Sequence, residues 1–138
     1  MKLILLTAST LLFVLSQNLP VEKGPLRNSF VTAAEAVLDS AAAIDVTATD
    51  SAYSPLFTHL QDTRAYLDSM AEGDRELGIA SNAKDIIFFV SACRLQAKNG
   101  ASTDKCLTQL TTARIRMMQQ LNRHKSGELW VEGPPAAR

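Results

Sequence analysis

The sequence predicts an all-α protein, an up-down-up-down four-helix bundle with one disulfide inside a helical hairpin. Apolar residues recur at alternating spacings of three and four along four stretches, which is the periodicity of a helix with one buried face. Alanine is plentiful, and long runs of β-branched residues alternating with polar ones are missing. Both features favour helices over a sheet. A chain of 138 residues is long enough for one such domain.

The clearest stretch runs from Ser81 to Lys125 and predicts two helices folded back on each other. Gly100 can take the left-handed conformation that ends the first helix, and Ser102 or Thr103 can cap the second. Cys93 and Cys106 lie at equal distances from this turn on the inward stripes, so the spacing predicts a Cys93–Cys106 disulfide. The expected buried residues are Ile79, Ala83, Ile86, Val90, Cys93 and Ala97, widened by Ile87, Phe89 and Leu95, then Cys106, Leu110, Ala113, Met117 and Leu121.

The preceding half predicts another helical pair. Its second helix is expected to begin at Ser54-Pro55, where Ser54 caps the helix and Pro55 needs no N–H donor, and to end at Gly73. The next helix begins either near Asp74 or after Ser81. The expected buried residues are Phe30, Ala34, Val37, Leu38, Ala41 and Ile44 in a helix that begins near residue 28, then Leu56, Phe57, Leu60, Leu67 and Met70.

A short basic and apolar segment opens the chain and predicts export. Lys2 precedes an apolar run that ends at Leu15, which is shorter than the roughly twenty residues of a membrane span. This pattern is typical of a secretory signal peptide, and an uncleaved membrane anchor is the alternative. In the periplasm or the extracellular space, paired cysteines are the expected state. The expected organisation is a signal peptide at 1–16, an extended leader at 17–28, the four-helix domain at 29–125 and a C-terminal tail at 126–138.

Charge is divided unevenly between the two halves. Residues 17–78 carry ten acidic and four basic residues, a balance of minus six, whereas residues 79–138 carry four acidic and nine basic, a balance of plus five. Either the two hairpins attract each other through weak surface pairs, or the second hairpin offers a basic face to an acidic protein partner. Trp130 is either a plug over one end of the bundle or an anchor for that partner. The expected partner-binding residues are Arg94, Lys98, Lys105, Arg116, Arg123 and Trp130.

Motifs of catalysis and cofactor binding are scarce. No G-x-G-x-x-G, P-loop or C-x-x-C pattern occurs. His59 and Asp62 stand one helical turn apart, the spacing of an acid–base pair, but no nucleophile in a recognisable context accompanies them. Met70, Met117 and Met118, with His59, are the available haem or metal ligands.

The function expected from the sequence is that of a small exported, non-enzymatic helical binding protein. Its class would be an inhibitor, an immunity-type protein, an adaptor or a chaperone-like protein, with no cofactor. A protein partner fits an exported domain better than nucleic acid does, because the basic residues lack interleaved aromatics. Two alternatives stay open: a ligand, haem or metal carrier that uses the bundle interior, and an enzyme that uses His59 and Asp62.

Overall fold

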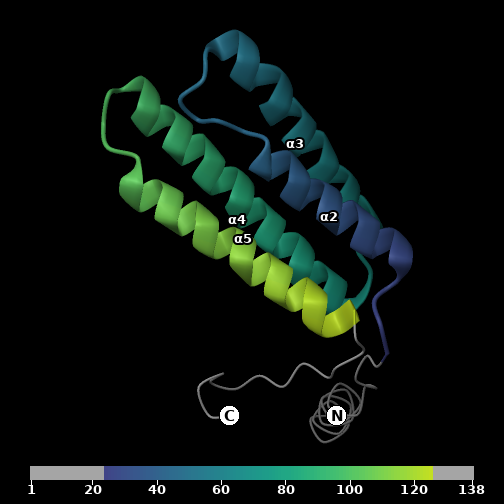
Figure 1. The fold of residues 1–138 in the computed structure, drawn as a ribbon. Helices are drawn as coiled ribbons and strands as arrows, with labels where there is room; N and C mark the ends of the chain where they lie inside the picture. Colours follow the sequence, from purple (N-terminus) through teal and green to yellow (C-terminus); the bar gives the residue numbers. More distant parts are fainter. Residues whose placement is uncertain (1–23, 126–138) are drawn as a thin grey trace, which may run out of the picture.

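The computed structural model describes residues 24–125, which form four α-helices and no strand (Figure 1). Consecutive helices run antiparallel, which confirms the predicted all-α, four-helix fold and its up-down-up-down order. The predicted signal peptide and tail, and most of the predicted leader, lie outside the described residues. The helices are α2 (Asn28–Ala42), α3 (Asp50–Met70), α4 (Gly73–Lys98) and α5 (Asp104–Lys125).

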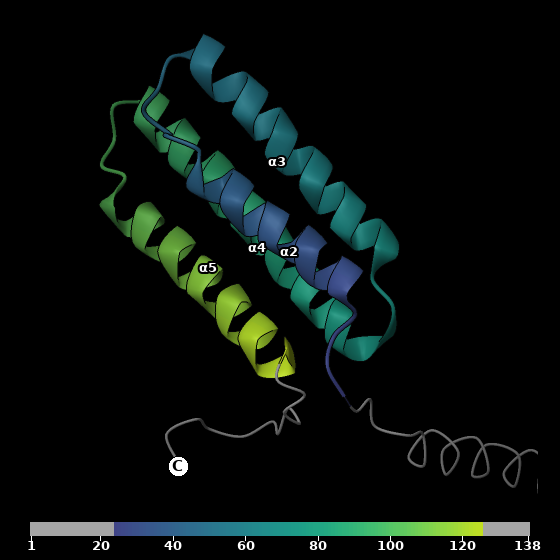
Figure 2. The same cartoon turned by 45° about the vertical axis from the view of Figure 1, so that its right-hand side comes forward.

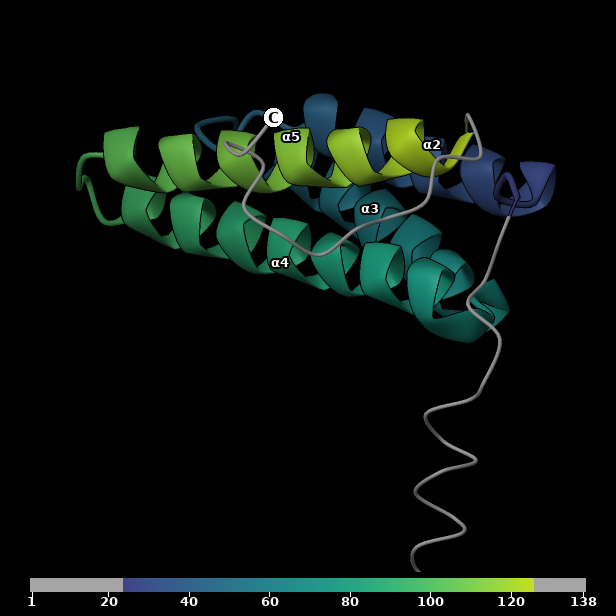
Figure 3. The ribbon, with the colours of Figure 1, turned by 90° about the horizontal axis from the view of Figure 1, so that it is seen from below.

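The four helices pack as two hairpins with unequal contact between them. α2 packs mainly on α3, and α4 packs mainly on α5. The hairpins meet where α4 packs on α2 and α3, and where α2 packs on α5. Within the described residues, no Cα atom of α3 lies within 8 Å of one of α5. Figure 2 shows the result: α2 and α4 form the middle of the bundle, and α3 and α5 are its two edges. Viewed from below in Figure 3, α4 and α5 lie side by side from the turn that joins them.

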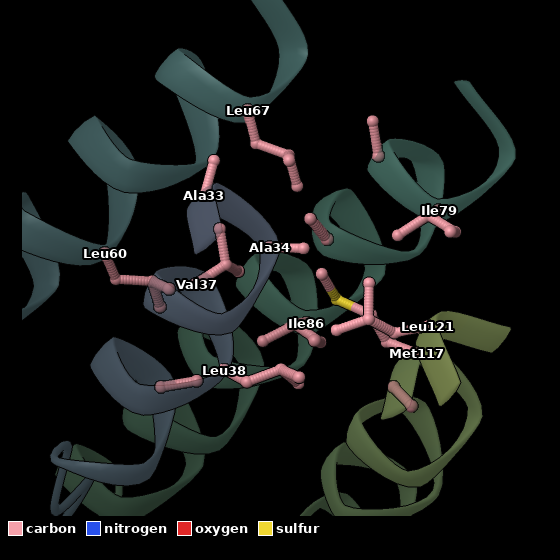
Figure 4. Close-up of a cluster of buried hydrophobic side chains, with 14 of the residues drawn as sticks. Ala33, Ala34, Val37, Leu38, Leu60, Leu67, Ile79, Ile86, Met117 and Leu121 are labelled. Atoms are coloured by element: carbon pink, nitrogen blue, oxygen red, sulfur yellow. The ribbon is translucent and has the colours of Figure 1, made fainter. Parts of the chain in front are cut away.

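The main hydrophobic core draws side chains from all four helices (Figure 4). Every residue of the predicted α5 stripe is buried, as are five of the six in the predicted α4 seam, Ala97 being half-buried. Two predicted core residues are wrong: Leu95 is 63 % exposed and Leu56 is 38 % exposed. Leu95 follows the buried Cys93 by two residues, which turns it about 200° around the helix axis and away from the core.

The start of α3 differs from the prediction. The helix begins at Asp50 and takes Pro55 into its interior, where the sequence had suggested a start at Ser54-Pro55. The carbonyl of Thr49 accepts bonds from the N–H groups of Ala52 and Tyr53 at 3.1 and 2.9 Å, so the helical turn is already formed before the proline. The longer helix buries Tyr53, a core residue that the periodicity missed.

The α4–α5 turn closes as predicted. Gly100 has a φ of 70°, and its N–H donates to Ala97, while the N–H of Ala101 donates to Gln96; these two bonds form a Schellman motif. The Cα atoms of Cys93 and Cys106 are 5.5 Å apart and their sulfurs are bonded, which confirms the predicted disulfide. Val46, from the loop between α2 and α3, packs on this pair in a small second cluster.

A polar network holds the opposite end of the bundle. Arg27, just before α2, donates from Nε to Oε2 of Glu76 at 3.0 Å, and its Nη2 also donates to this buried carboxylate. The N–H of Glu72 donates to Oε1 of Glu76 at 2.9 Å, and the φ of 74° at Gly73 reverses the chain there. These bonds fix the start of α4 at Gly73, so of the two predicted starts the one after Ser81 is wrong.

Between residues 24 and 125, no helix is both long and apolar enough to cross a membrane.

Candidate functional site

Arg94 lies inside the bundle and not on an open basic face. It is 9 % exposed, and its Nη1 donates to the carbonyls of Val46 at 2.8 Å and Ala48 at 2.5 Å. Its Nη2 donates to Oδ1 of Asp50 at 2.6 Å, and its guanidinium lies 4.4 Å from the ring centroid of Tyr53. The expectation of an exposed Arg94 is therefore wrong, because this side chain joins α4 to the loop between α2 and α3.

Lys98 shares the same carboxylate. Its Nζ donates to Oδ1 of Asp50 at 3.1 Å, one turn beyond Arg94. The hydrogen bond from Lys98, and then that from Arg94, lowers the pKa of Asp50 below its usual value. For these two cations, the attraction between the hairpins that the charge balance suggested is present in the structure.

The other basic residues of α5 are placed differently. Lys105, Arg116 and Arg123 are spaced eleven and seven residues apart, which puts them on one face of the helix over about 27 Å. Lys105 and Arg116 are exposed, and Arg123 is half-buried. Within residues 24–125, no carboxylate forms an ion pair with Lys105 or Arg116.

This basic row borders α4. Gln120 accepts a hydrogen bond from Asn82 of α4, so its side chain points toward that helix. Arg116 stands one turn before Gln120 and Arg123 one turn after it, on the same flank of α5. Trp130, the remaining expected partner-binding residue, lies outside the described residues.

An apolar row runs along the outward side of α4, opposite its buried stripe. Leu77, Phe88 and Leu95 are 50, 66 and 63 % exposed, and they have the same spacing of eleven and seven residues. The ring of Phe88 meets that of Phe89 edge to face, with centroids 5.4 Å apart, and Phe89 packs against the main core. Phe89 therefore restricts the position of the exposed Phe88 ring.

The register of the hairpin aligns the two rows. The Asn82–Gln120 hydrogen bond and the Cys93–Cys106 bridge place the start of α4 beside the end of α5. Both rows run along the hairpin, the basic one on the flank of α5 nearest α4 and the apolar one on the outward side of α4, with Ser81, Asp85 and Ala92 between them on α4. We call this surface the α4–α5 face; its residues are Leu77, Phe88, Leu95, Lys105, Arg116 and Arg123.

The sequence reasoning missed half of this face. Leu95 was assigned to the core, and Phe88 was not considered as a site residue. The available signal was the position of Leu77, Phe88 and Leu95 on the side of α4 opposite the buried stripe. Exposed apolar side chains that share one side of a helix are candidates for a surface that another group covers.

A groove of about 520 Å³ lies between α2 and α3 and contains both members of the candidate acid–base pair. His59 and Asp62 are exposed there, and no hydrogen bond joins them in the part of the chain that the structure describes. The lining residues are Ser29, Thr32, Ala33, Ala36, His59, Asp62, Thr63 and Tyr66.

The candidate haem or metal ligands are scattered. Met117 is fully buried, Met118 is 39 % exposed, and His59 is on the surface. Across residues 24–125, no three His, Cys, Asp or Glu side chains are grouped as a metal site requires.

The chain was also compared with protein-family models, curated proteins and solved structures, and none of them matches it. The proposed function therefore rests on the geometry of the α4–α5 face and of the groove between α2 and α3.

Proposed function

We propose that the protein is a small exported, non-enzymatic binding protein that takes a protein partner on the α4–α5 face. The observation that carries the proposal is Phe88, whose ring is 66 % exposed on the hairpin that also carries the exposed cations Lys105 and Arg116. Exposing a large aromatic ring to water is unfavourable, so a partner that covers the ring gains binding free energy. Aromatic side chains are also enriched among the residues that dominate binding energy.

The two rows suit a partner segment that is itself amphipathic and acidic. A helix laid along the hairpin would place apolar side chains on Phe88 and Leu95 and carboxylates beside Lys105 and Arg116. The apolar row would supply most of the affinity, whereas the basic row would raise the rate of encounter and fix the orientation. The face is about 27 Å long, which corresponds to five turns of such a helix.

The hairpin is ordered before a partner arrives. The disulfide and the Schellman motif fix the turn, and Phe89 holds the ring of Phe88. A surface that is already ordered loses less conformational entropy on binding, so more of the contact energy appears as affinity. The disulfide also supports export, because such bonds persist in oxidising compartments.

Site-specific photo-crosslinking in the native host tests the proposal. A photoreactive residue at position 88 should capture one dominant protein, which mass spectrometry identifies. The matched control is position 66 on α3, because Tyr66 is 61 % exposed and lies away from the face. Binding of the captured protein in purified form should then weaken in Phe88→Ser and Arg116→Glu. Capture from position 66 alone, or binding that neither substitution changes, contradicts the proposal.

A further inference from the structure

We propose that the groove between α2 and α3 binds a small organic cation, an amine that carries an apolar body. The groove belongs to the first hairpin, whose two helices lie side by side (Figure 2), so the inference goes beyond the function proposed for the α4–α5 face. Its volume of about 520 Å³ falls within the range of small-molecule sites, roughly 300–1,000 Å³. All of its lining residues belong to α2 or α3.

The groove is hollow because α2 presents only small side chains to it. The lining residues of α2 stand at positions 29, 32, 33 and 36, which share one side of a helix, and none is larger than threonine. The lining residues of α3 have the same spacing, at positions 59, 62, 63 and 66, but include a histidine and a tyrosine. Large side chains on one helix therefore border a space that the other helix leaves unfilled.

The floor of the groove is apolar. Ala33 is buried, and Ala36 and Thr63 are half-buried, whereas the other lining residues are exposed. The hydroxyl of Thr63 donates to the carbonyl of Leu60 at 2.9 Å, so it is already satisfied within α3. The methyl groups of the two alanines suit the apolar body of a ligand.

Tyr66 supplies an aromatic wall. It is 61 % exposed, and between residues 24 and 125 its ring is paired with no other aromatic ring and with no arginine. The face of a phenol ring attracts a cation and also packs on apolar groups. The exposed ring is therefore available to both parts of an amine ligand.

Asp62 supplies the opposite charge. Its carboxylate lines the groove, and no cation of the described residues forms an ion pair with it. Asp50 and Asp68, the other carboxylates of α3, pair with Arg94 and Lys84 of α4 at 2.6 and 3.9 Å. Asp62 is thus the carboxylate of α3 that is left for the ammonium group of a ligand.

The charge of the two helices favours a cation over an anion. Together α2 and α3 carry five carboxylates and one cation, five minus one, which leaves a balance of minus four: Glu35, Asp39, Asp50, Asp62 and Asp68 against Arg64. No lysine or arginine lines the groove. An anion would meet like charge there, whereas the same field attracts an amine.

Three probes of similar shape and different charge test the inference on the purified protein: phenylethylamine, the neutral phenylethanol and the anionic phenylpropionate. Because His59 also lines the groove and histidine side chains change charge between about pH 5 and 8, the titration is made at about pH 8. Backbone NMR shifts should concentrate at residues 29–36 and 59–66. We expect the amine to bind about tenfold more tightly than the alcohol, and the acid not to bind.

Two substitutions separate charge from shape. Asp62→Asn should lower the affinity for the amine to that for the alcohol. Thr32→Leu, at an exposed position of the lining, should fill the hollow and weaken both ligands. The matched control is Asp68→Asn, which removes a carboxylate of α3 that does not line the groove and should leave both affinities unchanged.

Equal binding of the three probes overturns the inference, as does the absence of shifts at millimolar amine. Amine binding that Asp62→Asn leaves unchanged also overturns it. Equal losses in Asp62→Asn and Asp68→Asn would show that the amine responds to the general charge of the hairpin and not to the groove. The titration needs no protein partner, so its failure leaves the crosslinking test at position 88 intact, and a failed crosslinking test leaves the titration standing.

Discussion

Arg94 donates from Nη2 to Oδ1 of Asp50 at 2.6 Å, and this ion pair ties the inner helix α4 to the first turn of α3. The same guanidinium satisfies two carbonyls of the loop between α2 and α3. One buried side chain therefore holds the loop that connects the first hairpin, and it does so from the second hairpin.

Replacing Arg94 by methionine should lower the free energy of unfolding by about 2 kcal/mol, because the carbonyls of Val46 and Ala48 lose their donor. The measurement is urea unfolding followed by circular dichroism. Lys98→Met is the matched control and should stay within about 0.5 kcal/mol of wild type, because its ion pair is exposed. If both variants lose the same free energy of unfolding, Arg94 stabilises the protein through its ion pair with Asp50 and not through the carbonyls of the loop.

Removing the disulfide should weaken the bundle without unfolding it. The bridge spans a sequence separation of 13, and loop-closure entropy of that size corresponds to about 3 kcal/mol. For a domain of this length, Cys93→Ala with Cys106→Ala should lower the melting temperature by roughly 10 °C or more and keep the helical signal at room temperature. Two thiols that react with an alkylating reagent in the untreated protein would refute the bridge. Complete loss of helix would mean that its contribution is larger than stated.

Stability should fall in acid through two carboxylates. Burial alone would raise the pKa of Glu76, but hydrogen bonds from Arg27 and from the N–H of Glu72 outweigh it, and the pKa is lowered. The pKa of Asp50 is lowered by Lys98 and Arg94. Both contributions are present above the unfolded pKa of about 4 and are lost as the pH falls through the folded values. The melting temperatures of wild type and of Asp50→Asn with Glu76→Gln should therefore differ at pH 7 and converge in acid. A constant difference contradicts this account.

Reversing charge on the α4–α5 face should affect binding and not stability. With a partner in hand, Arg116→Glu combined with Arg123→Glu should slow association, and the effect should shrink as salt screens the charges. Stopped-flow or surface-based kinetics gives the association rate, and calorimetry gives the melting temperature. A lower melting temperature with unchanged binding would show that these arginines serve the fold.

The mature chain should begin at Gln17 or within a few residues of it. The reason is the short apolar run that ends at Leu15 and is followed by the small residue Ser16. Intact mass of the protein from its native host decides the point. Recovery with Met1 in the membrane fraction would support an uncleaved anchor.

The fold was predictable because each helix repeats its apolar positions. Every residue of the α5 stripe from Cys106 to Leu121 is buried as expected, and the glycine turn fixed where α4 ends. The start of α3 was not predictable from neighbouring residues. Ser54-Pro55 is a strong local signal, but Tyr53 contacts Arg94 of a distant helix, and that tertiary contact extends the helix past the proline.

The candidate site was predictable only in part, because charge counts do not show where a side chain points. Arg94 and Lys105 contribute equally to the balance of the second hairpin, yet one is buried and the other exposed. Arg94 follows the buried Val90 by one turn, which places it at the border of the core. Phe88 could be recognised as a surface residue only after the buried side of α4 was known, because its apolar side chain alone suggests the core.

The small cluster of Val46, Cys93 and Cys106 is separate from the main core, so the two ends of the bundle are held together by different interactions. Val46 packs directly on the two cysteines, so the bridge of the second hairpin also supports the loop of the first. The other end, where Arg27 binds Glu76, contains no cysteine within the described residues. One end of the molecule therefore combines a covalent bridge with the ion pairs of Asp50, while the other is held by hydrogen bonds and charge alone.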